Sequence, residues 1–360
     1  MGADMMREFK TGRLALTSAG CFLGAGYVSG QELWKFFGAF GLPGLLGRVL
    51  ALAIQLVFVA LVLRLGQETG ITSLDRILIP GPHPLLHRLA GAMQLAFLFG
   101  VSVVMAAGAG ALVRQLLSLP AALGGALFCV GAALVSCRGM DGLARVCTVL
   151  VPGMIVTALV ISVWTVARTG FGAVLAMRDV NDNPLLPNWP TAALTYVSYN
   201  IFGAIGVLTP IGPHVPDRRT VWHGGALGVL LLLVISFCIL PALGARPDTT
   251  AAELPMLALA SELHPALGWL YAVLLLTGML GTTVSFVVAI VIYLGQRHPA
   301  LVPRRRAMTA GVLLLAFGGS LLGFGDLIGT VYPVFGYLGF AAMACLVLHW
   351  LRLRRAAKVR

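Results

Sequence analysis

The sequence predicts an all-α integral membrane protein with ten transmembrane helices, arranged as a 5+5 inverted repeat in which helices 1 and 6 are discontinuous. Three observations predict this fold class: the apolar composition, the uneven distribution of positive charge, and a repeat with a constant offset. Of the 360 residues, 59% are apolar and 11% are charged, and the mean hydropathy is +0.93. A soluble protein of this length needs far more polar surface, so the chain is expected to span a membrane.

Ten hydrophobic stretches follow one another along the chain. Most of them approach the roughly 20 residues that cross about 30 Å of hydrocarbon as a helix. The expected spans are 13–40 (broken), 44–65, 89–116, 120–136, 143–166, 191–210 (broken), 224–243, 266–295, 308–324 and 327–351.

Positive charges gather on one side of these spans. If the N-terminus is inside, most of the 25 Lys and Arg residues fall on the side of the two termini, including the tail at 354–360. This is the positive-inside bias, so both termini are expected in the cytoplasm and the chain in the inner (cytoplasmic) membrane of the cell. The net charge of +12 then marks topology beside anionic lipid, and the expected partners are the lipid bilayer and a small-molecule solute rather than nucleic acid.

The second half of the chain repeats features of the first half. Matches at an offset of 181 positions join His83-Pro84 to His264-Pro265 and Pro152 to Pro333. A constant offset over several elements indicates an internal repeat. We expect one transmembrane domain over 1–360, with repeat one at about 12–168, a linker at 169–190, repeat two at about 191–353 and a basic cytoplasmic tail at 354–360. Because each repeat holds five spans, the two repeats must have opposite orientations.

A glycine-rich stretch interrupts the first span. Gly24, Gly26 and Gly30 each cost roughly 1 kcal/mol against alanine in a helix interior, and Ser29 and Glu32 are polar at membrane depth. A helix break is therefore expected here. Open backbone at this depth is tolerated where it lines a cavity, so the break predicts a binding site whose N–H groups, around residues 28–30, hold an anionic group.

The sixth span contains the repeat-related counterpart of this stretch. Gly203 and Gly206 correspond to the first glycines at an offset of about 180, which predicts a second break. Polar and aromatic groups near the two openings suit a small polar ligand, although hydrogen bonds between helices are the alternative role for the polar ones. The expected substrate-binding residues are Gly24, Gly26, Tyr27, Ser29, Gly30, Gln94, Tyr199, Asn200, Phe202, Gly203 and Gly206.

Two motifs carry a family resemblance over essentially the whole chain. The run GAGYVSGQELWKFFG resembles the first-span signature of the YkvI family of bacterial membrane proteins, and SYNIFGAIGVLTPIG resembles the sixth span of that family. The ten-span repeat is similar to the LeuT-like fold of the amino acid–polyamine–organocation superfamily. The resemblance implies a cation-coupled secondary transporter of a small polar or zwitterionic, amino-acid-like solute.

The same resemblance implies a bound sodium ion, and no other metal or cofactor is expected. Carbonyl oxygens of Gly20 and Leu23 and hydroxyls of Thr282 and Thr283 match the positions that hold the ion in sodium-coupled members of the fold. Alternatively, the two threonines bond to their own helix or to a neighbouring one. A second sodium site found in some relatives needs an amide at the position of Tyr27, which argues against that site here.

Three charged residues are candidates for gating or proton coupling. Glu32 lies inside the first span, where a carboxylate is costly, and Asp326 stands before the tenth span with Lys35 as its nearest expected partner. Alternatively, Glu32 and Lys35 form an i, i+3 pair at the membrane edge, and Asp326 lies in a loop without a functional role.

The sequence thus predicts a secondary transporter working by alternating access. The alternative is a membrane sensor or assembly protein that retains the fold without transporting. An enzyme is not expected, since no catalytic spacing of Ser, His, Asp or Cys is visible and no residue has an expected catalytic role.

Overall fold

The computed structural model describes residues 10–138 and 141–359, and every regular element in these two ranges is helical. Phe40 and Asp179 add a single isolated β-bridge. Seven described helices are long and apolar enough to cross a membrane. All ten expected spans coincide with helical segments, and α15 continues through the described part of the basic tail.

The elements follow in this order. They are α1 (Thr11–Gly20), α2 (Ala25–Val28), α3 (Gln31–Leu33), the π-helix η1 (Trp34–Gly38), α4 (Leu42–Thr69), α5 (Leu74–Leu78), α6 (Pro84–Leu117), α7 (Ala121–Arg138), α8 (Asp141–Thr169), α9 (Phe171–Leu175), α10 (Trp189–Leu208), the 3₁₀ helix η2 (Thr209–His214), α11 (Arg218–Ala245), the 3₁₀ helix η3 (Pro247–Ala251), α12 (Pro255–Leu263), α13 (Pro265–Arg297), the 3₁₀ helix η4 (Pro299–Arg304), α14 (Arg305–Ser320) and α15 (Phe324–Val359).

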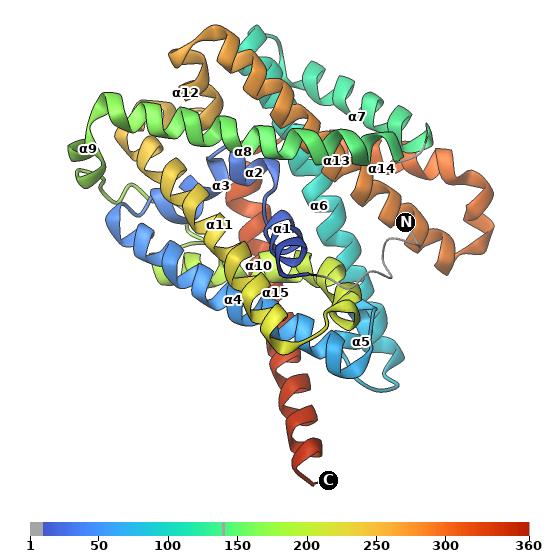
Figure 1. Cartoon of the computed structure of the whole chain (residues 1–360). Helices are drawn as coiled ribbons and strands as arrows, with labels where there is room; N and C mark the ends of the chain where they lie inside the picture. Colours follow the sequence, from blue (N-terminus) through green and yellow to red (C-terminus); the bar gives the residue numbers. More distant parts are fainter. Residues whose placement is uncertain (1–9, 139–140, 360) are drawn as a thin grey trace.

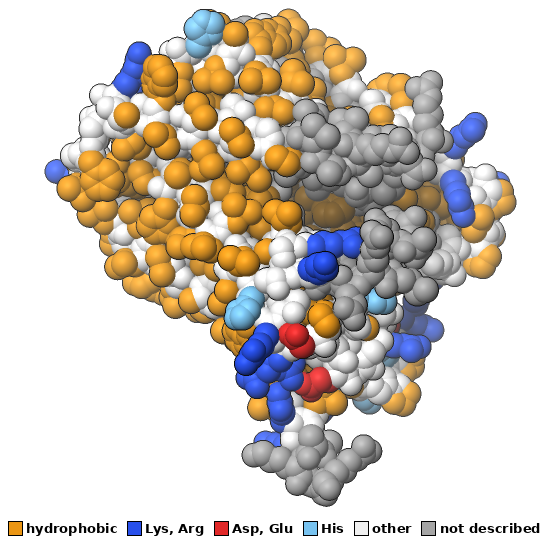
Figure 2. Space-filling model, in the orientation of Figure 1, with side chains coloured by type: hydrophobic (Ala, Val, Ile, Leu, Met, Phe, Trp, Pro, Cys, Tyr) orange, Lys and Arg blue, Asp and Glu red, His pale blue; other side chains and the backbone are white. Residues whose placement is uncertain are grey.

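The surface of the bundle is apolar. Hydrophobic side chains cover the upper left of the visible face, whereas charged side chains gather near the base of the projecting C-terminal helix (Figure 2). Exposed leucines and valines recur on α4, α8, α11 and α13. An apolar outer surface of this kind is stable against lipid, so the chain is a multi-pass membrane protein.

The first span is broken, as expected from its glycines. Helix α1 ends at Gly20 and α2 begins at Ala25, so the open backbone is at Cys21–Gly24. A second irregularity follows at Gly30, whose φ of +84° is a left-handed conformation that only glycine adopts readily. The span therefore turns twice before α3 and η1 continue it.

The expected break at Gly203 and Gly206 is wrong. Helix α10 is continuous from Trp189 to Leu208 and changes to a 3₁₀ helix only afterwards. The physical reason is close packing: a Cβ atom at Gly203 would lie 2.7 Å from the ring of Phe97 on α6. Glycine here lets an aromatic ring approach an intact helix, so it does not signal a break.

Helix starts follow the repeat. Pro84 opens α6 and Pro265 opens α13, each directly after a histidine, because the missing N–H of proline needs no partner in the first turn. The chain then packs α1 against α11 and α10 against α4, with α6 beside α7 and α13 (Figure 1). The short helix α12 lies at the top of Figure 1, far from the C-terminal end of α15 at the bottom.

Candidate functional site

A cavity of about 440 Å³ lies at the break in the first span. Its wall is formed by residues of α1 to α3 together with α6, α8, α10, α13 and α15. The expected site residues that line it are Gly20, Leu23, Gly24, Glu32, Tyr199, Asn200, Gly203 and Thr282. The structure therefore brings residues from both halves of the sequence to one cavity.

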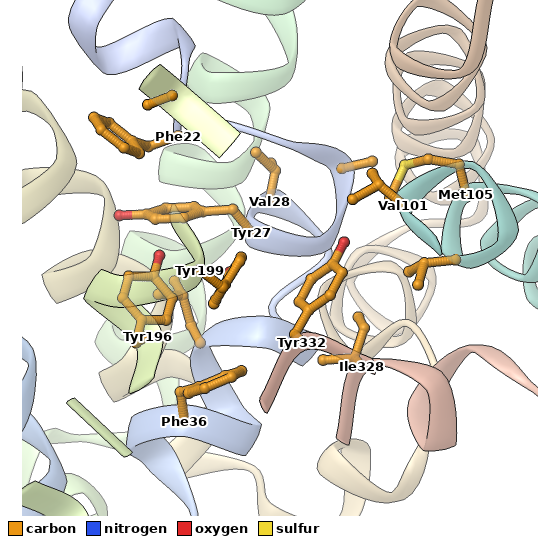
Figure 3. Close-up of a cluster of buried hydrophobic side chains, with 14 of the residues drawn as sticks. Phe22, Tyr27, Val28, Phe36, Val101, Met105, Tyr196, Tyr199, Ile328 and Tyr332 are labelled. Carbon is orange, nitrogen blue, oxygen red and sulfur yellow. The ribbon is translucent and has the colours of Figure 1, made fainter. Parts of the chain in front are cut away.

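Glu32 is the charged group of this cavity. Its side chain is only 4% exposed, and its Oε1 atom accepts a hydrogen bond from the hydroxyl of Tyr199. The ring of Tyr199 stacks on that of Tyr332 with centroids 4.8 Å apart, and the two rings lie between Tyr196 and Val101 (Figure 3).

Gly26 makes room for this carboxylate. A Cβ atom at Gly26 would lie 2.9 Å from Oε2 of Glu32 and 3.7 Å from the hydroxyl of Tyr332. Gly26 does not itself line the cavity, so its contribution to the site is the space that it leaves.

Arg48 is a buried charge that our sequence analysis missed. Its guanidinium donates to the Tyr27 hydroxyl at 2.8 Å and to the Ser236 hydroxyl at 3.2 Å, and its carbon Cζ lies 5.0 Å from the ring centre of Tyr196. Its side chain is fully buried. The signal was present, because an arginine within the expected span 44–65 is costly unless it has buried partners.

Tyr27 belongs to the arginine cluster and does not line the cavity. Its hydroxyl donates to the carbonyl of Leu232 at 2.7 Å and accepts from Arg48. Phe202 is also outside the cavity wall and packs edge-on against Phe97, with centroids 5.5 Å apart.

The expected anion site around residues 28–30 is wrong. The N–H groups of Val28, Ser29 and Gly30 already donate to backbone carbonyls of residues 24, 25 and 27. Since the helix restarts at Ala25, any backbone N–H groups left open by the break belong to the start of α2.

The remaining polar residues of the expected site lie apart from the cavity wall. Ser29 donates to the carbonyl of Gly26 at 2.9 Å, and its own carbonyl accepts from the N–H of Met256. The Oε1 atom of Gln94 is buried without a hydrogen bond among the described residues, near Gly206 on α10.

The expected sodium ligands divide into two groups. Gly20, Leu23 and Thr282 line the cavity, and the Thr282 hydroxyl donates to the carbonyl of Gly278 at 3.1 Å. Thr283 is fully buried, and its hydroxyl has no partner in the described part of the chain. Nor do the described residues contain a group of three His, Cys, Asp or Glu that could hold a metal ion.

The expected gating residues are not joined. Asp326 is exposed, Lys35 is half-buried, and the ion pairs found between described residues link neither of them, nor Glu32, to a partner. Another acid connects the elements near α12: Glu253 pairs with Arg114 of α6 at 2.7 Å and accepts the N–H of Phe324 at 3.0 Å.

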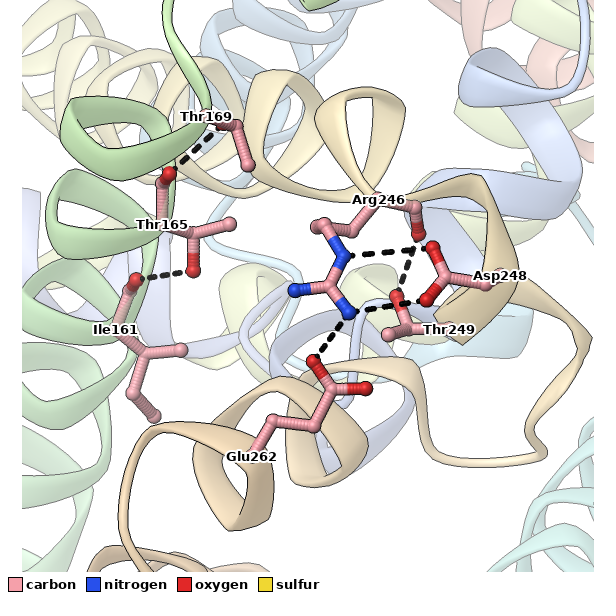
Figure 4. Close-up of polar contacts among 7 residues, drawn as sticks. All are labelled: Ile161, Thr165, Thr169, Arg246, Asp248, Thr249 and Glu262. Atoms are coloured by element: carbon pink, nitrogen blue, oxygen red, sulfur yellow. Dashed lines mark hydrogen bonds and ion pairs between the residues drawn. The ribbon is translucent and has the colours of Figure 1, made fainter.

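A second polar cluster surrounds the ends of α11 and α12. Arg246 contacts Asp248 at 3.0 Å and Glu262 at 2.7 Å (Figure 4). The hydrogen bonds from Arg246 lower the pKa of the Asp248 carboxyl below its ordinary value. Both clusters hold the connector between α11 and α13 in place, and Met256 of α12 bonds to the turn at Ser29.

The sequence was compared with protein families and with known proteins. No protein-family model matches the chain. The membrane protein YkvI of Bacillus subtilis (strain 168) is 24% identical over 341 residues, which cover 93% of this chain and 94% of YkvI. The protein YyaD of the same organism is 26% identical over 334 residues, which cover 92% of this chain and 94% of YyaD. The resemblance to the YkvI membrane proteins is confirmed.

Solved structures identify the fold. MhsT in complex with L-phenylalanine has a TM-score of 0.65 at 19% identity, covering 93% of this chain and 87% of that one. The inward-facing conformation of Mhp1 has a TM-score of 0.68 at 15% identity, covering 98% and 79%. A Na⁺-coupled sialic acid symporter has a TM-score of 0.59 at 13% identity, covering 97% and 81%. The YkvI-like chain therefore has the LeuT-like fold.

Proposed function

We propose that this YkvI-like protein is a secondary transporter that carries a small polar or zwitterionic solute by alternating access. The observation that carries this proposal is the cavity of about 440 Å³ at the break between α1 and α2. A helix break that lines a cavity is typical of transporters whose substrate lies at the middle of the membrane. The LeuT-like fold supports the same function class, although fold alone does not determine it.

The architecture proposed for this transporter is two inverted repeats of five helices. The helix contacts support it, because exchanging each helix with its counterpart in the other repeat converts one observed contact into another. The contact of α1 with α11 becomes that of α10 with α4, and the contact of α6 with α14 becomes that of α13 with α7. Such exchange is expected of a pseudo-twofold axis.

Cation coupling is the mechanism proposed for driving the solute. Carbonyl oxygens of Gly20 and Leu23 and the hydroxyls of Thr282 and Thr283 would supply the oxygen ligands that a sodium ion needs. Support comes from the buried, unpartnered hydroxyl of Thr283, which costs free energy until it finds a ligand or donor partner. One structural neighbour is a Na⁺-coupled symporter, which agrees with this mechanism.

The orientation proposed has both termini in the cytoplasm and α12 on the opposite side of the inner membrane. The positive-inside bias supports it. The contacts of Glu253, Arg114 and Met256 would then keep the outer side of the cavity closed.

Solute flux in proteoliposomes tests the proposed function. The purified protein is reconstituted into vesicles loaded with unlabelled amino acids and amines, and uptake of the labelled solutes from outside is measured with and without a sodium gradient. Uptake above protein-free vesicles supports transport. Binding without any flux would instead favour a membrane sensor or assembly protein that retains the fold.

A further inference from the structure

We propose that the solute carries a positively charged ammonium-type group, which pairs with Glu32, and an apolar body, which contacts the aromatic wall of the cavity. This inference deepens the proposed transport function and rests on the same cavity. It assigns to Glu32 the role of selecting the charge of the solute.

The charges around the cavity are one-sided. Of the described residues that line it, Glu32 alone carries a charge. The buried cation Arg48 is not part of the wall, because its guanidinium is held by the hydroxyls of Tyr27 and Ser236 and by the rings around it. A solute in the cavity therefore meets an acid and no basic side chain.

The carboxylate of Glu32 has room for a further donor. Tyr199 supplies the hydrogen bond that the described residues make to Oε1. The hydroxyl of Tyr196 is also buried near this carboxylate. Among the described residues, the cation that interacts with this buried carboxylate is Arg48, which lies behind the cavity wall, so an ammonium group on the cavity side can add both charge and N–H donors.

The rest of the wall suits the apolar part of an organic cation. Phe22, Phe97 and Phe286 line the cavity together with Met105 and Met154. The stacked rings of Tyr199 and Tyr332 stand beside the carboxylate, where their faces attract a cation. An inorganic ion would leave this large apolar wall without contacts, so an organic cation is favoured.

Thermal unfolding of the purified wild-type protein tests the charge requirement. The probes are three molecules of similar shape: phenethylamine, which is a cation at neutral pH, 2-phenylethanol, which is neutral, and 3-phenylpropionate, which is an anion. We expect phenethylamine to raise the unfolding temperature at concentrations at least about tenfold lower than the other two probes require. This comparison needs no variant to fold. Equal shifts from the three probes, a larger shift from the neutral or anionic probe, or no shift from any of them would overturn the proposal.

Two variants locate the effect at Glu32. Glu32→Gln keeps the shape of the side chain and should lose about tenfold or more of the phenethylamine affinity, leaving the three probes nearly equal. Gly26→Ala should weaken the binding of phenethylamine as well, because the added methyl group would displace Oε2 of Glu32. The control is Asp182→Asn, which removes a carboxylate from the exposed linker. An unchanged preference for phenethylamine in Glu32→Gln would overturn the assignment.

The flux assay separates this inference from the proposed function. If only neutral or anionic solutes are transported, the proposed transport function is supported and the ammonium requirement is overturned. Glu32-dependent binding of phenethylamine without flux of any solute would sustain the requirement and overturn transport.

Discussion

Two buried charges distinguish this membrane protein at the residue scale. Glu32 and Arg48 are the buried members of Asp, Glu, Lys and Arg among the described residues, and they interact electrostatically across a group of tyrosines. Removing one charge of such a pair leaves the other uncompensated, whereas removing both relieves the cost. The contribution of the pair to stability can therefore be measured only by comparing the single variants with the double variant.

Arg48→Met should lower the free energy of unfolding by about 3 to 5 kcal/mol, because Glu32 then stays buried without a compensating charge. The double variant Glu32→Gln/Arg48→Met should lose less free energy of unfolding than the two single variants lose together, by about 0.5 to 3 kcal/mol. Thermal unfolding of the four proteins in one detergent measures this coupling. Strict additivity would show that the two charges do not stabilise one another.

Thr283→Val should leave the sodium-free protein as stable as wild type or more stable, since it removes a buried hydroxyl without a partner. The rise in unfolding temperature that sodium gives the wild type should disappear in this variant. The control is Thr277→Val on the same helix, where the hydroxyl is exposed and bonds to the carbonyl of Val273. A sodium response of the same size in Thr283→Val and wild type would exclude the proposed ligand role.

At the element scale, similar glycine patterns gave one broken helix and one intact helix. The sequence correctly predicted the break in the first span, since nothing lies within 4 Å of a Cβ atom at Gly24 and the chain is free to open there. The same argument failed for α10, because Phe97 comes from a helix about 100 positions away in sequence and its contact with Gly203 is visible only in three dimensions. Local propensity cannot include a packing partner whose position depends on the whole fold.

Gly203→Ala and Gly24→Ala form a matched pair that tests this distinction. We expect Gly203→Ala to destabilise the protein by about 1 to 3 kcal/mol, because the ring of Phe97 would have to shift from its contacts with Phe202 and Phe335. Gly24→Ala should cost less than about 1 kcal/mol, since its φ of −90° suits alanine and the space is open. Unfolding temperatures of both variants check the order, and a reversed order would contradict it.

At the scale of the whole molecule, composition and periodicity predicted much of the fold and little of the site. Each transmembrane helix contacts lipid independently of the others, so its apolar residues are visible in the local sequence. The spans and the repeat can therefore be predicted directly. The position of Arg48 and the hydrogen bonds of Tyr27 depend on how α4 meets α11 and α10, and no local pattern contains that information. The cavity residues that were predicted lie beside the break, at Glu32, in the repeat-related part of α10 and at Thr282.

The orientation of the molecule can be tested with single cysteines. Asp182→Cys in the linker should react with a membrane-impermeant maleimide in intact cells, whereas Arg355→Cys near the C-terminus should react only after the membrane is opened. The unmodified chain measures the background from its own six cysteines. Protection of residue 182 together with labelling of residue 355 in intact cells would contradict the proposed topology.

The continuity of α10 has a mechanical consequence. A helix with an unbroken ladder of main-chain hydrogen bonds is stiff along its axis. Between α1 and α2 this ladder is interrupted, because the helical bonds of α1 end with the N–H of Leu23 and α2 begins at Ala25, so the interruption is a joint. In the proposed transport cycle, α1 would swing at this joint while α2 stays with Glu32. Helix α10 has no such joint up to Leu208, so it must tilt as one rod and carry Tyr199 and Asn200 with it. We therefore expect the two halves of the protein to contribute unequal motions to the cycle: a bend from the first and a tilt from the second.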